Sequence, residues 1–272
     1  MEETATVAPA DAGRPPFVYA LGKVEPRFPS LAVEKEFAQA SGRYSTSGLT
    51  DRQVLRTLIT DRQNRYLARL LCWVFSVEGV ECYIVRPRDP SDFELLADAV
   101  RDEPRRDDLD VVIGTLGPIA PPEVCNGLAL PTLVFDQIYS FDRDSLVDAI
   151  PRPDSVPEDR ADGFRRAAGE LFDRIMQMAD NAGATDEHRA LNYLAVRYPA
   201  IYSAAAEANE RNVSLTGVQV LPSRLSGARK IVEVVFTYTH RQTDVTEKRF
   251  VRVDVTEEFM FLAGKLSDYF DR

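Results

Sequence analysis

Two histidines, His188 and His240, are the first groups to weigh for chemistry in this sequence. A serine-type hydrolase needs a histidine within hydrogen-bond reach of an activated serine. His188 precedes the helical pattern RALNYL, and His240 ends a strand-like segment beside an expected turn. Neither neighbours a nucleophile-elbow sequence. The histidines therefore argue against a serine protease.

Cys125 and Asp136 are the candidate catalytic residues, in a region predicted to be largely loop. Cys125 lies in PPEVCNG after a buried-type strand, where functional residues tend to lie. A reactive thiolate needs a nearby base or helix N-terminus, and the neighbouring sequence offers none. The alternative is a small buried thiol beside a turn. An enzyme built on either residue would add groups from the second half, such as Arg197 or Tyr198.

The three cysteines, Cys72, Cys82 and Cys125, are scattered and include no CxxC pair. This pattern favours a reducing compartment without a disulfide framework. Cys72 and Cys82 are expected to be packing residues in a core helix and a core strand. A tetrahedral zinc site would need all three cysteines and a histidine to converge, which their spacing does not support. We expect no metal site.

No cofactor is expected either. Residues 114–117 (GTLG) follow a strand, which is the right place for a phosphate-binding loop. They lack the third glycine and the Lys-Ser/Thr pair of such loops, and the next residues are rich in proline.

Charge points to one local binding strip on an acidic protein. The chain has 33 basic and 43 acidic residues, a net charge of −10, which argues against nucleic acid or an anionic membrane as partner. Residues 224–252 instead hold seven basic and three acidic residues, a net charge of +4. They form either a solvated hairpin or a docking strip for an acidic peptide. The candidate binding residues are Arg229, Lys230, Arg241, Lys248, Arg249 and Arg252.

The first half of the chain alternates strand-like and helix-like segments. Residues 1–16 are small, acidic and proline-bearing, which predicts a disordered tail. Strands are expected at 17–22, 80–86, 109–116 and 130–135. Helices are expected after Ser30, over about 25 residues from Asp51, from Ser91 or Asp92 to Val100, and from Asp142 to Ile150. A mixed α/β subdomain over 17–150 is the prediction.

A linker at 151–160, with three prolines in ten residues, is predicted to separate this part from a subdomain at 161–272. Helices are expected at 162–180 and 187–211, the second interrupted by Pro199. Strands at 213–221, 229–240 and 247–255 alternate apolar and polar residues and predict an antiparallel three-stranded meander. A closing helix is expected from Glu257. The fold class is therefore α+β.

Several long blocks carry a family resemblance. They are FVYALGKVEPRFPSLAVEKEFAQA at 17–40, GPIAPPEVCNGLALPTLVFDQIYSFD at 117–142, RALNYLAVRYPAIY at 189–202 and DVTEKRFVRVDVTEEFMFLAGKLSDYFDR at 244–272. Together they resemble the C-terminal domain of unknown function of the cyanobactin maturation proteases, the PatA/PatG type. The catalytic residues of the protease domain have no counterparts in this sequence. We expect the domain to stand alone here.

The resemblance implies a module for maturing a ribosomally synthesised, post-translationally modified peptide. The leading hypothesis is a non-catalytic accessory protein that binds the precursor peptide or a modifying enzyme. An extended peptide could add to the edge of the C-terminal sheet. The alternatives are a peptide-modifying enzyme with a site in the 117–142 region, and a structural dimer that scaffolds its partners. A cytoplasmic location and a possible homodimer are also expected.

Overall fold

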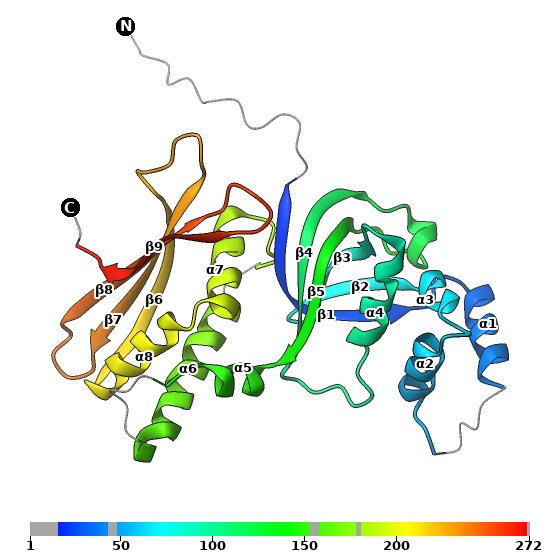
Figure 1. The fold of residues 1–272 in the computed structure, drawn as a ribbon, viewed down its shortest axis with the longest axis horizontal. Coiled ribbons are helices and arrows are strands. Elements are labelled where there is room, and N and C mark those ends of the chain that lie inside the picture. Colours follow the sequence, from blue (N-terminus) through cyan, green and yellow to red (C-terminus); the bar gives the residue numbers. More distant parts are fainter. Residues whose placement is uncertain (1–15, 43–47, 153–157, 178–180, 271–272) are drawn as a thin grey trace, which may run out of the picture.

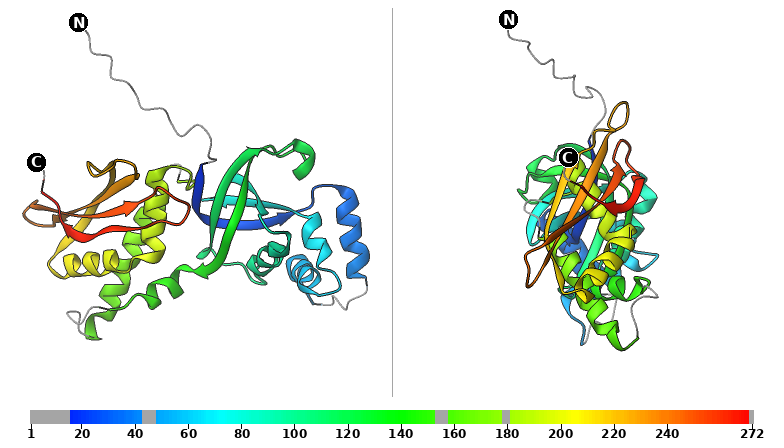
Figure 2. Two further views of the ribbon diagram at one scale, coloured as in Figure 1. Left: turned by 45° about the horizontal axis from the view of Figure 1, so that its top comes forward. Right: turned by 90° about the vertical axis from the view of Figure 1, so that its left-hand side faces the viewer.

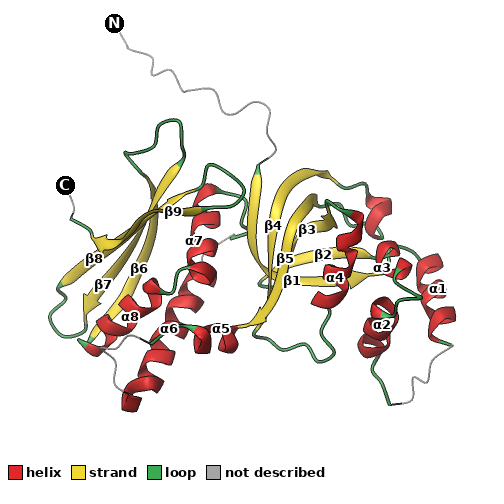
Figure 3. Cartoon of the chain, viewed as in Figure 1, coloured by secondary structure: helices red, strands yellow, loops and turns green. Residues whose placement is uncertain are grey.

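The computed structural model describes residues 16–42, 48–152, 158–177 and 181–270. The predicted tail at 1–16 therefore lies, except for Pro16, outside the described residues. The middle of the predicted linker, 153–157, also lies outside them. The described residues form two β-sheets with helices around them, and this confirms the α+β class (Figures 1 and 3).

The first sheet is a closed five-stranded barrel with the strand order β1-β2-β3-β5-β4. Its strands are β1 (Phe17–Arg27), β2 (Cys72–Val77), β3 (Val80–Pro87), β4 (Asp108–Ile119) and β5 (Pro131–Asp142). All neighbours are antiparallel except β3 and β5. This is the strand arrangement of an OB-type Greek-key barrel, which by itself assigns no function.

The long strand β1 closes the barrel by pairing with two partners. Its residues 17–22 pair with β4 and its residues 23–27 pair with β2. Gly22 lies where the pairing changes, and a Cβ there would lie 2.2 Å from the carbonyl oxygen of Ser76. Only glycine lets the two backbones approach this closely.

Helices cover the barrel at one end. They are α1 (Leu31–Ser41), α2 (Asp51–Thr60) and α3 (Tyr66–Leu70) between β1 and β2, and α4 (Phe93–Ala99) between β3 and β4. A 3-10 turn, η1 (Pro90–Asp92), precedes α4, and η2 (Pro122–Cys125) lies between β4 and β5. The predicted helix of about 25 residues from Asp51 is wrong. It ends at Thr60, and the apolar run that follows forms α3 and then the buried strand β2, because Trp73, Val74 and Phe75 fit the barrel interior and wall.

The second half packs helices against an open antiparallel sheet with the order β6-β7-β8-β9. The chain enters it through α5 (Arg143–Ala149) and η3 (Glu158–Arg160). The helices are α6 (Ala161–Met176), α7 (Asp186–Arg197) and α8 (Ala200–Glu210), and the strands are β6 (Val213–Pro222), β7 (Ile231–His240), β8 (Thr246–Asp254) and β9 (Phe261–Asp268). The break at Pro199 and the meander of β6 to β8 are confirmed.

The predicted closing helix is wrong, because residues 261–268 form the strand β9. The apolar residues Leu262 and Leu266 suggested a helical face, but they pack against the core from an edge strand paired with β8. Pairing with β8 determines the structure of this segment, and the local sequence pattern carries no information about that pairing. The sheet therefore has four strands, and β8 is not at its edge.

The hydrophobic core of the second half also includes residues of the barrel strands, and it thereby joins the two halves. In β1, Val18 and Ala20 face the core that fills the barrel, whereas Tyr19 and Leu21 face the core of the second half. Helix α7 lies against this outer face of β1 (Figure 2). The buried amide of Asn192 on α7 donates to the Tyr19 carbonyl oxygen at 2.8 Å. The two sheets are thus held side by side through β1, while the predicted domain division stays a prediction.

Candidate functional site

Asp136 lies in strand β5, not in a loop as expected, and forms a two-point ion pair with Arg88. Arg88 follows β3, which runs parallel to β5. Its Nε and Nη2 lie 2.6 and 2.7 Å from the two carboxylate oxygens of Asp136, and Nη2 also donates to Thr115 Oγ1 at 3.0 Å. This guanidinium lowers the pKa of Asp136, so the carboxylate stays charged at neutral pH.

Glu258, from the turn between β8 and β9, shares this site with Asp136. Burial raises the pKa of Glu258 to about 7, with further contributions from the hydrogen bond and the charge of Asp136. One of its carboxyl oxygens, Oε1, is buried without a hydrogen-bond partner among the described residues. A carboxylic acid beside a carboxylate shares a proton, and their pKa values separate. Glu258 is therefore the acid of the pair and Asp136 the charged acceptor.

Arg189 on α7 holds the Glu258 turn in place. Its side chain is 3% exposed. Nη1 donates to the Val255 carbonyl oxygen at 2.9 Å, and Nη2 donates to the Glu257 carbonyl oxygen. Its guanidinium carbon lies 5.3 Å from the centre of the Phe17 ring at the start of β1. The carboxyl pair thus lies where the barrel, α7 and the β8–β9 turn meet.

The expectation of three free cysteines is wrong, because Cys72 and Cys125 form a disulfide. Cys72 begins β2 rather than lying in a helix, and Cys125 ends η2 in the loop between β4 and β5. Both side chains are buried in a small cluster with Val74, Ile84 and Ala120. The spacing of 53 residues hid this pairing, since only the closed barrel brings the two segments together. A disulfide sulfur is not a free thiolate nucleophile.

Arg197 and Tyr198 make contacts apart from both candidate catalytic residues. The Arg197 guanidinium carbon lies 5.1 Å from the centre of the Tyr139 ring, and the Tyr139 hydroxyl lies 3.0 Å from that of Tyr19. The Tyr198 hydroxyl accepts a hydrogen bond from the Leu266 backbone at 3.1 Å. Among the described residues, no hydrogen bond or ion pair joins either of them to Cys125 or Asp136. Arg197 therefore connects α7 to strand β5 of the barrel, and Tyr198 connects the end of α7 to β9.

Most of the six basic candidates have partners within the second half of the chain. Arg229 pairs with Asp254 at 2.7 Å, Arg252 with Glu233 at 2.9 Å, and Arg249 with Glu207 at 3.6 Å. The Lys248 amine lies 5.9 Å from the centre of the Tyr269 ring. The backbone of Lys230 bonds to Thr256 and Val255. Glutamate and aspartate partners therefore neutralise much of the charge that the sequence segment carries.

Arg241 differs, because its described partners are neutral. Its Nε donates to Ser214 Oγ at 2.5 Å and its Nη2 to Asn209 Oδ1 at 3.1 Å. It lines a cavity of about 300 Å³ between α6, α8 and the start of β6. Arg174 of α6 lines the same cavity and donates to the Thr216 carbonyl oxygen at 3.2 Å. This cavity therefore holds two arginine side chains without an ion pair among the described residues.

The cavity lies beside the start of β6, which is an edge strand of the second sheet among the described residues. The pairing of β6 with β7 is unbroken from Gly217 to Pro222. Ser223 donates its backbone N–H to Ile231 on β7, so in this register the odd-numbered residues of β6 face β7. Val218 and Val220 therefore direct their N–H and C=O groups away from the sheet. Pro222, which lacks an N–H, occupies an outward-facing position, as proline does in edge strands.

Sequence reasoning missed Glu258, Arg189 and Arg174. Glu257 and Glu258 lie where the sequence predicts the start of a closing helix, but they belong to the turn between β8 and β9. Arg189 and Arg174 lie on predicted helices. The sequence around an arginine on a helix does not show whether its side chain will be buried, will contact the edge of a sheet, or will be exposed to solvent. Among the described residues, no group of three or more His, Cys, Asp or Glu side chains could hold a metal ion. None of the described helices is long and apolar enough to cross a membrane.

This arrangement defines a two-part α+β domain, a closed barrel joined to a helix-backed antiparallel sheet. Residues 158–269 match the family model described as "PatG C-terminal". Over nearly the whole chain the fold is that of a solved structure titled "PatG Domain of Unknown Function", with a TM-score of 0.74, 20% identity, and coverage of 93% of this chain and 98% of that chain. No curated protein matches the chain. The resemblance to the PatG C-terminal domain is thereby confirmed.

Proposed function

We propose that this protein is a non-catalytic accessory module for peptide maturation that binds an extended, acidic segment of a precursor peptide or modifying enzyme along β6. The cyanobactin context comes from the PatG relatives and is carried to this chain as part of the proposal. A cytoplasmic location and a homodimer stay predictions. The observation that carries the proposal is the free edge of β6 beside the cavity of Arg174 and Arg241.

Backbone geometry supports an added strand. The outward N–H and C=O groups of Val218 and Val220 are the groups that a peptide pairs with in β-augmentation. The first sheet offers no such edge, because it is a closed barrel. At the opposite edge of the second sheet, the register of β9 shifts twice against β8. Such bulges disfavour pairing with another strand. β6 is therefore the edge best suited to a peptide.

Charge supports an acidic segment. Arg174 and Arg241 lie where the regular part of β6 begins, and an aspartate or glutamate of the added strand could accept from both. Glu170 and Asp173 also line the cavity. Glu170 forms no ion pair among the described residues, so the two arginines exceed the unpaired carboxylate by one charge. Asp173 is already paired with Arg143 at 2.7 Å. It therefore repels an acidic peptide less than a free carboxylate would.

Calorimetric titration of the full chain with the pathway's precursor peptides and modifying enzymes tests the proposal. Val220→Pro removes an outward N–H without removing a ladder bond, whereas Val220→Ala shortens the same side chain and keeps that N–H. We expect Val220→Pro to abolish binding and Val220→Ala to retain it. Arg241→Ala should weaken binding about tenfold, the value of a hydrogen bond to a charged group. Equal binding by the two Val220 variants, or no binding by any partner, would refute the proposal.

The carboxyl pair favours a second candidate, an enzyme that uses Glu258 as a general acid. An acid whose pKa lies near 7 is suited to that role. Product formation in a reconstituted pathway would distinguish the two functions. Glu258→Gln should leave product formation unchanged if the module only binds, and should lower it about a hundredfold or more if Glu258 transfers a proton.

A further inference from the structure

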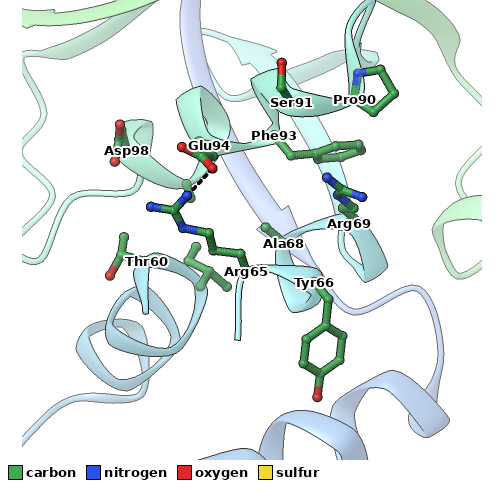
Figure 4. Close-up of a pocket in the computed structure, with 12 residues that line it drawn as sticks. Thr60, Arg65, Tyr66, Ala68, Arg69, Pro90, Ser91, Phe93, Glu94 and Asp98 are labelled. Carbon is green, nitrogen blue, oxygen red and sulfur yellow. Dashed lines mark hydrogen bonds and ion pairs between the residues drawn. The ribbon is translucent and has the colours of Figure 1, made fainter. Parts of the chain in front are cut away.

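A second cavity lies in the helical region beside the barrel, away from β6. It has a volume of about 360 Å³ and lies among α2, α3, η1 and α4. Its apolar base is formed by Ile59, Ala68 and Ala97, each at most 3% exposed. The aromatic side chains of Tyr66 and Phe93 line it from two sides (Figure 4). Such a cavity suits a single apolar or aromatic group.

Two arginines of this cavity have different environments. Arg65 forms an ion pair with Glu94 of α4 on one side of the cavity. Arg69 lies on the other side, next to Phe93, and Asp98 is at the opposite end (Figure 4). Within the described part of the chain, Arg69 makes no hydrogen bond or ion pair. An exposed guanidinium beside an aromatic ring presents its donors in the fork that matches a carboxylate.

We propose that this cavity binds a carboxylate that carries an apolar or aromatic group, with the carboxylate on Arg69 and the apolar group against Ala68, between Tyr66 and Phe93. Two sources share this chemistry, a small free carboxylic acid and the C-terminal residue of a peptide. The site lies within residues 59–98, outside the segment 158–269, and does not depend on the function proposed for β6.

The chain contains its own reporter for this site. Trp73 is the only tryptophan, and its indole Nε1 donates to the Ala68 carbonyl oxygen at 2.9 Å. A ligand that packs against Ala68 perturbs this hydrogen bond. The single indole N–H resonance in a ¹H–¹⁵N spectrum therefore reports occupancy without a label on the ligand.

The experiment titrates the full chain with N-acetylphenylalanine and with its amide, and then with short peptides that end in phenylalanine as a free acid or an amide. We expect the free acids to shift the indole resonance to saturation and the amides to bind at least about tenfold more weakly, because the amide lacks the charge that Arg69 recognises. Saturation by the peptide at lower concentration than by the small acid would assign the source as a peptide C-terminus, and the reverse would assign a free acid.

Two variants complete the test. Arg69→Gln should abolish the preference for the acid over the amide. Arg62→Gln is the matched control, since Arg62 is exposed in the same segment and does not line the cavity. Equal affinity for acid and amide, no shift with either acid, or unchanged preference in Arg69→Gln would overturn the proposal.

Discussion

Replacing Glu258 by glutamine should change how the stability of this protein depends on pH. The pKa of Glu258 is raised to about 7 from an ordinary value of 4.5, because burial and Asp136 disfavour its charge. The folded protein therefore holds a proton that the unfolded chain releases between these two values. Where the native state binds more protons, stability falls as pH rises. This contribution is fully present below about pH 4.5 and is lost by about pH 7.

The magnitude follows from the difference in pKa between the two states. If the whole difference in pKa contributed to the free energy of unfolding, it would amount to about 3 kcal/mol. Glu258 is only partly buried, so solvent screens much of the interaction, and about 1 kcal/mol is the value to expect. Glutamine keeps a donor for Asp136 and never ionises. Glu258→Gln should thus resemble the wild type near pH 4.5 and become more stable by about 1 kcal/mol above pH 7.

Urea denaturation of the wild type and Glu258→Gln at intervals from pH 4.5 to 9 measures this difference. The control is Glu123→Gln, which removes an exposed carboxylate from η2. Its profile corrects for the loss of one negative charge from the protein. Parallel profiles for Glu258→Gln and the wild type would refute the reasoning, because they would mean that Glu258 titrates alike in the folded and unfolded states.

Four further substitutions test the structural frame. Cys72→Ser should lower the free energy of unfolding by up to about 4 kcal/mol, since the disulfide to Cys125 closes a loop with a sequence separation of 53. Cys82→Ser should have a small effect, and a reductant should lower the melting temperature of the wild type but not of Cys72→Ser. Gly183→Ala should cost about 2 kcal/mol or more in thermal unfolding, because φ is +75° and a Cβ would lie 2.3 Å from the Tyr19 carbonyl oxygen. Gly163→Ala in α6 should stabilise by about 0.5–1 kcal/mol, because nothing lies within 4 Å of its added Cβ.

Local patterns predicted the elements whose structure is decided locally. The alternation of Val232, Val234, Phe236 and Tyr238 with Glu233, Thr237 and Thr239 defines β7, and these four apolar residues belong to the core that the helices share. Pro199 separates α7 from α8 because proline cannot continue the hydrogen bonding of the preceding helix. The all-apolar run in β4 marks a strand buried on both faces, with Val111 and Val112 in different cores.

The sequence predictions fail where pairing with a segment distant in the sequence determines the local structure. β9 has a weak strand pattern and forms because β8 offers it an edge. Residues 136–142, expected to be a loop, extend β5 because β4 pairs with them as far as Asp108. The disulfide required the barrel to bring the start of β2 to the loop before β5. Each of these partners is too far away in the sequence to influence the local pattern of apolar and polar residues from which a helix or strand is predicted.

The same reasoning explains why a net charge could not locate a binding surface. The number of arginines and lysines in the segment 224–252 is correct, but it does not give the charge that a partner would meet. The pairing of β7 with β8 places Glu233 opposite Arg252, and this ion pair neutralises the charge of Arg252. Arg241 escapes this pairing because it follows the end of β7 and turns towards Ser214 and Asn209. Arg174 joins it from a helix that lies outside the segment. The charge available to a partner is therefore set by what each arginine meets after folding. That is why two arginines from separate elements, beside an unpaired strand edge, are stronger evidence for a peptide site than the six basic residues of the hairpin.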